Sequence, residues 1–212
     1  MRYKIGYVDE DPAQVARYKI KLSDHFDVIG YDIQKGMPLL ELVKMVYTSD
    51  IDLLMVDFLM VERGILTYNG DEVVKLFEEI KPRFPIIIFT NYEGQAFSQV
   101  DNPNIIYDKS ILKEDLGHFV EIIKKNIKIY KDYIQKRKDA INKLVEKAES
   151  ERLSGSEKNA LLENQLELKN LDKWSNEVPY QLLMDEKKFN DLSKTRKEAE
   201  AFLESLIKKN KQ

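Results

Sequence analysis

The residues best suited to chemistry in this sequence are carboxylates that follow short apolar runs. Asp9 and Glu10 follow the run at 3–8, and Asp57 stands at the end of Leu53-Leu54-Met55-Val56. Carboxylates placed close together raise one another's pKa unless a cation lies among them. A hard divalent cation such as Mg²⁺ takes oxygen ligands, and an aspartate can accept a phosphoryl group as a nucleophile. These residue types therefore indicate Mg²⁺ binding by Asp9, Glu10 and Asp57, with phosphoryl acceptance on Asp57.

Two further groups fit the same chemistry. Thr90 ends the apolar run PIIIFT, and Lys109 follows the run at 104–107. A lysine ammonium binds phosphoryl oxygens as a point charge, and a threonine hydroxyl can donate a hydrogen bond to one. Each also has a plain alternative, Thr90 as a β-former that ends a strand and Lys109 as a surface lysine. The order of the acids, the hydroxyl and the ammonium along the chain favours a shared site.

The segments between these groups predict the elements that must position them. Short apolar runs alternate with amphipathic segments, which indicates a parallel sheet covered by helices on both faces. Ligands of such sheets bind beyond the carboxyl ends of the strands, so all five groups are expected at one edge. The predicted strands cover residues 3–8, 27–31, 51–57, 85–90 and 104–107, and the predicted helices cover 12–26, 38–47 and 70–80, with a short fourth helix before the last strand.

Four motifs carry a resemblance to a known family. VDEDP, MVDFLM, IIIFTN and YDKS resemble the acidic pair, the phospho-acceptor strand, the switch-threonine strand and the lysine turn of response-regulator receiver domains. The resemblance covers residues 1–111 and implies a (βα)5 flavodoxin-like fold. It also implies Mg²⁺-dependent phosphoryl transfer to Asp57 from a histidine kinase or phosphotransfer protein. Such a protein is a phosphorylated switch of two-component signal transduction, not a turnover enzyme.

The sequence departs from the family's pattern chiefly where the site is read out. Asn91 follows the switch threonine where a small residue is common, and we expect Asn91, Leu59 and Tyr92 to tune access to the phosphoryl group. Ile106 occupies the usual switch-aromatic position. Tyr107, one residue later, is therefore the candidate switch aromatic, with packing in the core as its alternative.

Other departures alter the surroundings of the site. Glu10 stands where the second acid is more often Asp, and Val61 occupies a usual proline position. Ser110 replaces the usual proline after the lysine. The loop VERGILTYNG is longer than usual, and the compressed segment at 90–109 is the reason to expect a short fourth helix.

From residue 112 the pattern changes to that of a long helix. Apolar residues recur at alternating spacings of three and four from Leu116 to Ala148, interrupted by Arg137, which predicts a helix over about 112–152. We favour a homodimer through this helix. The alternative is that it folds back on later helices as a bundle.

Two later helices complete a helical output or dimerisation region at 112–212. Ser154 and Glu157 have the spacing of a capping box for a helix at about 156–171, and another helix is predicted at about 185–209. The predicted fold class is therefore an α/β receiver followed by an all-α extension. This extension is expected to bind an output protein that the sequence does not identify.

Composition excludes several classes of function. The chain has no cysteine, so disulfides and thiol chemistry are excluded. The start lacks the apolar region of a signal peptide, and no apolar stretch has the length of a membrane span, so we expect a cytoplasmic protein without membrane association. The helical region is charge-balanced and shows no helix-turn-helix with a basic recognition helix, so we expect no sequence-specific DNA binding.

Two other functions compete with the phosphorylated switch. One is a pseudo-receiver, a scaffold that binds partners without phosphorylation. The other is an aspartyl-nucleophile phosphohydrolase, which needs a second acid two residues after the nucleophile. Leu59 stands at that position, which disfavours the enzyme.

Overall fold

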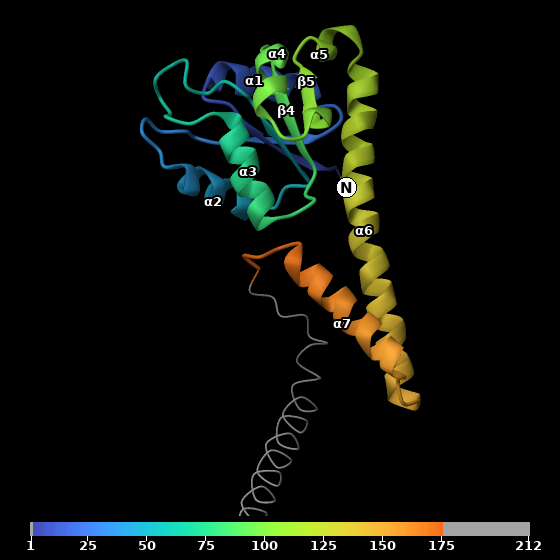
Figure 1. Cartoon of the computed structure of the whole chain (residues 1–212). Helices are drawn as coiled ribbons and strands as arrows, with labels where there is room; N and C mark the ends of the chain where they lie inside the picture. Colours follow the sequence, from blue (N-terminus) through green and yellow to red (C-terminus); the bar gives the residue numbers. More distant parts are fainter. Residues whose placement is uncertain (1, 176–212) are drawn as a thin grey trace, which may run out of the picture. The chain divides into compact units, whose positions relative to one another are not determined.

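The computed structural model describes residues 2–175, and Figure 1 shows their helices and strands. Five parallel strands form one sheet in the order β2-β1-β3-β4-β5, which confirms the predicted flavodoxin-like order. The predicted helix at 185–209 lies outside the described residues. The strands are β1 Lys4–Val8, β2 Asp27–Gly30, β3 Leu53–Val56, β4 Ile86–Thr90 and β5 Ile106–Asp108.

The middle of the sheet is the most apolar part of the fold. β3 and β4 are buried at every position, as parallel strands covered on both faces must be. In the register, Val8 of β1 lies opposite Val56 of β3, and Val56 lies opposite Ile88 of β4. The ends of β1 and β3 therefore lie level with each other, which places the residues that follow them side by side.

Short helices connect the strands. The Asp11 side chain accepts a hydrogen bond from the Ala13 N–H at 3.0 Å, and Pro12 opens the first helix, so Asp11 is the N-cap of that helix. The fourth helix has seven residues, as the compressed segment predicts. The bounds are α1 Pro12–Leu22, α2 Leu39–Thr48, α3 Gly70–Ile80, α4 Glu93–Gln99, a 3₁₀ turn at Pro103–Ile105 and α5 Ile111–Glu114.

Different helices cover the two faces of the sheet. Tyr7 and Phe89 from the strands share one apolar cluster with Tyr18 of α1 and Phe119 of α6, the helix at Leu116–Ser150. In Figure 1, α2 and α3 lie together on one side of β4 and β5, and α6 lies on the other. Burying one large apolar side chain contributes roughly 1.5–3 kcal/mol, so packing of these helices on both faces stabilises the sheet.

The long helix begins later than the sequence pattern suggests. α6 covers Leu116–Ser150, after the separate turn α5. Asp115 causes the break, because its side chain accepts a hydrogen bond from the His118 N–H at 2.9 Å and so caps a new helix.

The first part of the apolar seam of α6 packs against the sheet. Val120, Ile123 and Ile127 are buried in the cluster that contains the strand residues. These three side chains are therefore already covered within one chain. A homodimer through 112–152 stays a prediction, and it would have to use other parts of the helix.

The described chain divides into two compact units. Residues 2–136 and Asn170–Lys173 belong to the first, and 137–169 with 174–175 belong to the second. The second unit contains the end of α6 and nearly all of α7, Gly155–Asn170. The capping box is present, because Ser154 N–H donates to Glu157 Oε2 at 2.9 Å and Glu157 N–H donates to Ser154 Oγ at 3.3 Å. Among the described residues, no helix is both long and apolar enough to cross a membrane.

Candidate functional site

Four neighbouring strands deliver the predicted site residues to one edge of the sheet. Asp9 follows β1, and Asp57 follows the adjacent β3, with its N–H donating to the Val8 carbonyl at 2.8 Å. Lys109 follows β5, and its N–H donates to the Thr90 carbonyl at the end of β4 at 2.9 Å. Because the backbone ladder continues into these residues, their side chains begin from fixed positions.

The carboxylates of Asp9, Glu10 and Asp57 converge at this edge. One oxygen from each lies within 4.8 Å of the others, and all three residues are buried. The buried Lys109 ammonium pairs with two of them. Its Nζ lies 3.1 Å from Asp9 Oδ2 and 3.0 Å from Asp57 Oδ1. The structure thus brings together four of the residues that the sequence pattern placed in the site.

Burial dominates the electrostatics of this cluster. It raises the pKa of Asp57 to about 6, although Lys109 acts in the opposite direction. Burial also raises the pKa of Glu10 to about 7, and the neighbouring Asp9 acts in the same sense. For Lys109, burial alone would lower the pKa, but Asp57 and Asp9 together raise it above its usual value. One lysine therefore does not fully compensate three converging carboxyl groups.

The donor set fits a hard divalent cation. Glu10 Oε2 is buried and has no hydrogen-bond partner among the described residues, so it is an acceptor with an unmet requirement. Carboxylate oxygens are the ligands that Mg²⁺ prefers, and it usually combines one or two of them with several waters. Asp9, Glu10 and Asp57 are the residues that would hold it.

Thr90 is fully buried at the end of β4. Its Oγ1 accepts a hydrogen bond from the Tyr92 N–H at 3.1 Å, which leaves its own proton available to donate. Asn91 and Tyr92 are exposed directly after it, and Leu59 is half-buried two residues after Asp57. These positions are compatible with the predicted tuning of access.

The long loop after β3 is tied to the loops on both sides of the site. The Tyr92 hydroxyl, after β4, donates to Glu62 Oε1 at 2.8 Å. Arg63 Nη1 lies 2.8 Å from Oδ1 of Asp11, which follows β1. Glu62 and Arg63, which are adjacent in this long loop, thus contact the loops on its two sides.

Similar chains are found among solved structures. No protein-family model matches the chain, and no curated protein does. Similar solved structures include an adenylate cyclase from Rhodopirellula baltica (20% identity, 63% of this chain and 95% of that chain, TM-score 0.47). They also include a response regulator receiver protein from Sinorhizobium medicae WSM419 (16% identity, 60% of this chain and 95% of that chain, TM-score 0.47). A third is a response regulator receiver domain protein from Clostridium thermocellum (18% identity, 61% of this chain and 97% of that chain, TM-score 0.44).

The strand order and the residues at the strand ends decide the fold. A 2-1-3-4-5 parallel sheet carries acids after β1 and β3, a threonine at the end of β4 and a lysine after β5. The chain has a receiver-domain fold. It covers about 60% of the chain and is followed by C-terminal helices.

Tyr107 has a packing partner in this receiver fold. It is half-buried on β5, and its ring lies edge-on to Phe119 of α6 with centroids 5.9 Å apart. Burial raises its pKa. These contacts support the core-packing alternative, and a switching role for Tyr107 stays a prediction.

Sequence reasoning missed two residues of the receiver site. A Cβ on Gly70 would collide with the Asp57 carbonyl oxygen, so only glycine lets α3 begin this close to Asp57. Its place just after Asn69 at the end of a long loop was the available signal. The other is Tyr7, whose hydroxyl donates to Asp9 Oδ2 at 2.5 Å. Nothing in an apolar strand pattern distinguishes such a tyrosine from ordinary core.

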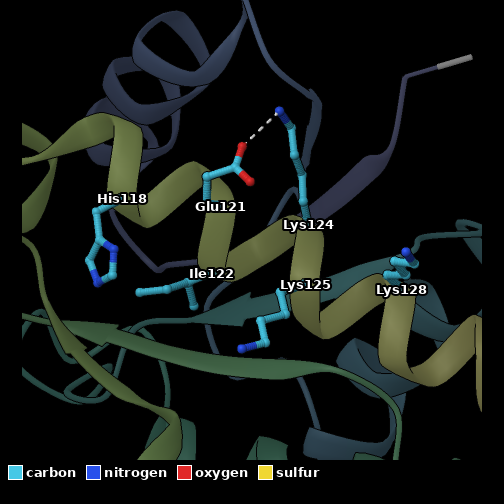
Figure 2. Close-up of a pocket in the computed structure, with 6 residues that line it drawn as sticks. All are labelled: His118, Glu121, Ile122, Lys124, Lys125 and Lys128. Carbon is cyan, nitrogen blue, oxygen red and sulfur yellow. Dashed lines mark hydrogen bonds and ion pairs between the residues drawn. The ribbon is translucent and has the colours of Figure 1, made fainter.

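A separate surface hollow lies along α6 of the receiver fold, shown in Figure 2. Its lining comes from a single helix, and one ion pair, Lys124 with Glu121 at 3.3 Å, crosses it. It contains none of the predicted site residues. The lining residues are His118, Glu121, Ile122, Lys124, Lys125 and Lys128.

Proposed function

We propose that this protein is a two-component response regulator that accepts a phosphoryl group on Asp57 in a Mg²⁺-dependent reaction. The donor is a histidine kinase or a phosphotransfer protein. The observation that carries the proposal is the buried cluster in which Lys109 pairs with both Asp9 and Asp57 while Glu10 Oε2 has no partner among the described residues. Such an arrangement has an unmet requirement for positive charge at the point where a phosphoryl group would arrive.

Each residue has a role in the proposed transfer. An Asp57 oxygen attacks phosphorus, a new P–O bond forms, and the P–N bond to the donor histidine breaks with the electron pair leaving on nitrogen. The Lys109 ammonium stabilises charge on the phosphoryl oxygens, and the Thr90 hydroxyl donates a hydrogen bond to one of them. A bound Mg²⁺ would neutralise charge on the same oxygens. Asp57 must be ionised to attack, and with a pKa of about 6 it is mostly ionised at neutral pH.

The output of this switch is proposed to be a change in protein–protein contacts of the helical region, without sequence-specific DNA binding. α6 supports this, because its first part is built into the receiver core through Phe119, Val120 and Ile123. A change at the sheet edge can therefore reach a helix that continues beyond the core. The output partner and a homodimer through 112–152 remain part of the proposal, as does a cytoplasmic location.

The experiment is phosphorylation by acetyl phosphate, followed by intact mass measurement. With Mg²⁺, the wild-type chain should gain the mass of one phosphoryl group, and EDTA should prevent the gain. Asp57→Asn should show no gain. Asp50→Asn is the matched control, because Asp50 is an exposed carboxylate and asparagine tolerates its positive φ of 51°. A wild-type chain that stays unmodified, or a modified Asp57→Asn chain, would contradict the proposal.

A phosphorylation-independent scaffold is the second candidate. It is favoured by the Glu62–Tyr92 hydrogen bond, which joins two loops beside Asp57. Under this alternative, acetyl phosphate leaves the mass unchanged, and Asp57→Asn binds the output partner as the wild type does. The mass measurement therefore separates the two candidates.

A further inference from the structure

Tyr7 places a hydroxyl group at the base of the acidic cluster. Its side chain is fully buried on β1, and its hydroxyl donates to Asp9 Oδ2 at 2.5 Å. Residues two apart on a strand point to the same face, so Tyr7 and Asp9 share a face of the sheet. The tyrosine side chain is long enough for its hydroxyl to contact the carboxylate of Asp9, just after the end of the strand.

The ring of Tyr7 is fixed by aromatic neighbours. It lies edge-on to Tyr18 of α1, with centroids 5.7 Å apart, and edge-on to Phe89 of β4 at 6.3 Å. Lys109 Nζ lies 5.9 Å from the centroid of the ring. Such contacts hold a ring in one orientation, because aromatic pairs prefer edge-to-face geometry. The hydroxyl therefore reaches Asp9 from a rigid support.

Asp9 is held at both of its oxygens. Oδ1 accepts the Asp11 N–H at 2.9 Å, and Oδ2 accepts both the Tyr7 hydroxyl and the Lys109 ammonium. A carboxylate offers about four lone-pair sites, so room for a cation remains. Glu10, by contrast, has an unpartnered Oε2 among the described residues. Asp9 is thus the carboxylate whose orientation is set before any cation arrives.

We propose that Tyr7 is a positioning residue for divalent-cation binding, acting through its hydrogen bond to Asp9. This inference rests on the proposed function, because it takes Asp9 as a ligand. Hydrogen-bond partners of ligating carboxylates fix the direction of the ligand, and their removal typically weakens metal affinity about 10–100-fold. Removing the Tyr7 hydroxyl frees one oxygen of Asp9 to turn towards Lys109 alone.

The test measures cation affinity directly, without a phosphoryl donor. Wild type, Tyr7→Phe and Tyr18→Phe are titrated with Mn²⁺, and free Mn²⁺ is followed by electron paramagnetic resonance. Tyr7→Phe should bind about 10-fold more weakly or worse. Tyr18→Phe is the matched control, because Tyr18 lies in the same aromatic cluster and also near Lys109, while no bond to Asp9 is found for its hydroxyl in the described chain. Its affinity should equal that of the wild type.

The outcomes separate this inference from the proposed function. If wild type and Tyr7→Phe bind Mn²⁺ equally, or if Tyr18→Phe weakens binding as much, the inference on Tyr7 is overturned while the acceptor site stands. If the wild type does not bind Mn²⁺, both are overturned. Should Tyr7→Phe fail to fold, the wild-type Tyr7 hydroxyl proton can be followed by NMR during a Mg²⁺ titration. A shift that saturates with binding supports the inference, and an unchanged resonance overturns it.

Discussion

The sheet edge of the first unit and the helix pair of the second place lysine–carboxylate pairs in opposite environments. Lys109 is buried at 3.0–3.1 Å from Asp57 and Asp9, whereas Lys147 is partly exposed at 2.7 Å from Glu157. At the sheet edge, burial raises the pKa of Asp57 to about 6 even beside the lysine. In the second unit, hydrogen bonds from Lys147 and Ser154 lower the pKa of Glu157 to about 2.

The difference shows that closeness to a cation does not by itself determine how a carboxylate behaves. Water still solvates Glu157, so its partners only add to an already stable charge. Asp57 has lost that solvation, and a shared lysine does not fully replace it. The sheet edge consequently retains a demand for positive charge that the helix pair lacks. That demand is the physical basis for the proposed cation and phosphoryl site.

Lys109→Met should give the largest effect on stability. The variant keeps the apolar stem but leaves Asp9 and Asp57 buried without their cation. Removing one partner of a buried ion pair costs about 3–5 kcal/mol. We expect a loss of this size in urea unfolding at pH 8 in EDTA, and a smaller loss at pH 5, where Asp57 takes up a proton.

The control for this variant is Lys124→Met on α6. Lys124 forms an exposed pair with Glu121, and substitutions at such sites usually change stability by about 0.5 kcal/mol or less. Equal losses in the two lysine variants would mean that burial does not distinguish the sheet edge from an exposed surface, and the contrast drawn above would fail.

Asp57→Asn should stabilise the cation-free protein in a pH-dependent way. The pKa of Asp57 rises from its ordinary 3.8 to about 6 on folding, so the folded state holds a proton that the unfolded state releases between these values. The associated stability is present below pH 4 and is lost as the pH rises through 6. Asparagine resembles the protonated form and avoids that loss.

The expected advantage of Asp57→Asn grows from pH 5 to pH 8 and reaches about 1–3 kcal/mol in EDTA. Urea unfolding of both chains across this range measures it. Mg²⁺ should then stabilise the wild type more than the variant at pH 8, since binding to the folded state adds to its stability. Parallel stability curves for the two chains would show that Asp57 carries no desolvation cost.

Much of the α/β fold and the acidic site could be predicted from the sequence. Parallel strands have short apolar runs, and their carboxyl ends share one edge, so the order of the acids, Thr90 and Lys109 was enough to bring them together. Gly70 and Tyr7 escaped prediction for a physical reason. The role of Gly70 depends on a backbone contact with a residue that is distant in sequence. The role of Tyr7 depends on a hydroxyl group in an otherwise apolar strand pattern.

The helical region was less predictable because an apolar seam on a helix does not specify which element packs against it. The spacing in α6 correctly indicated an apolar stripe, but a sheet and a second helix both bury such a stripe. Val120 and Ile123 face the sheet cluster, whereas Ile141 is buried in the second unit. The break at Asp115 was equally hidden, since an aspartate within a charged segment gives no sign that it caps a helix.

The smallest effect is expected for Arg137 and Glu167 in the second unit. Arg137 interrupts the apolar seam, and its Nε lies 2.5 Å from Glu167 Oε2, with both side chains partly exposed. Double-mutant cycles on exposed pairs typically give 0.2–1 kcal/mol, so the cycle of Arg137→Met and Glu167→Gln should give a coupling energy below about 1 kcal/mol.

The salt dependence of the Arg137–Glu167 coupling distinguishes it further from the buried Lys109 pairs. Exposed charges are screened by added salt, whereas buried pairs are screened much less. The Arg137–Glu167 coupling should therefore shrink in high salt, while the loss caused by Lys109→Met should change little. A coupling of several kcal/mol that resists salt would place Arg137 in an environment like that of Lys109. The interruption of the seam would then be a specific interhelical contact, and not merely a polar residue that the helix pair tolerates.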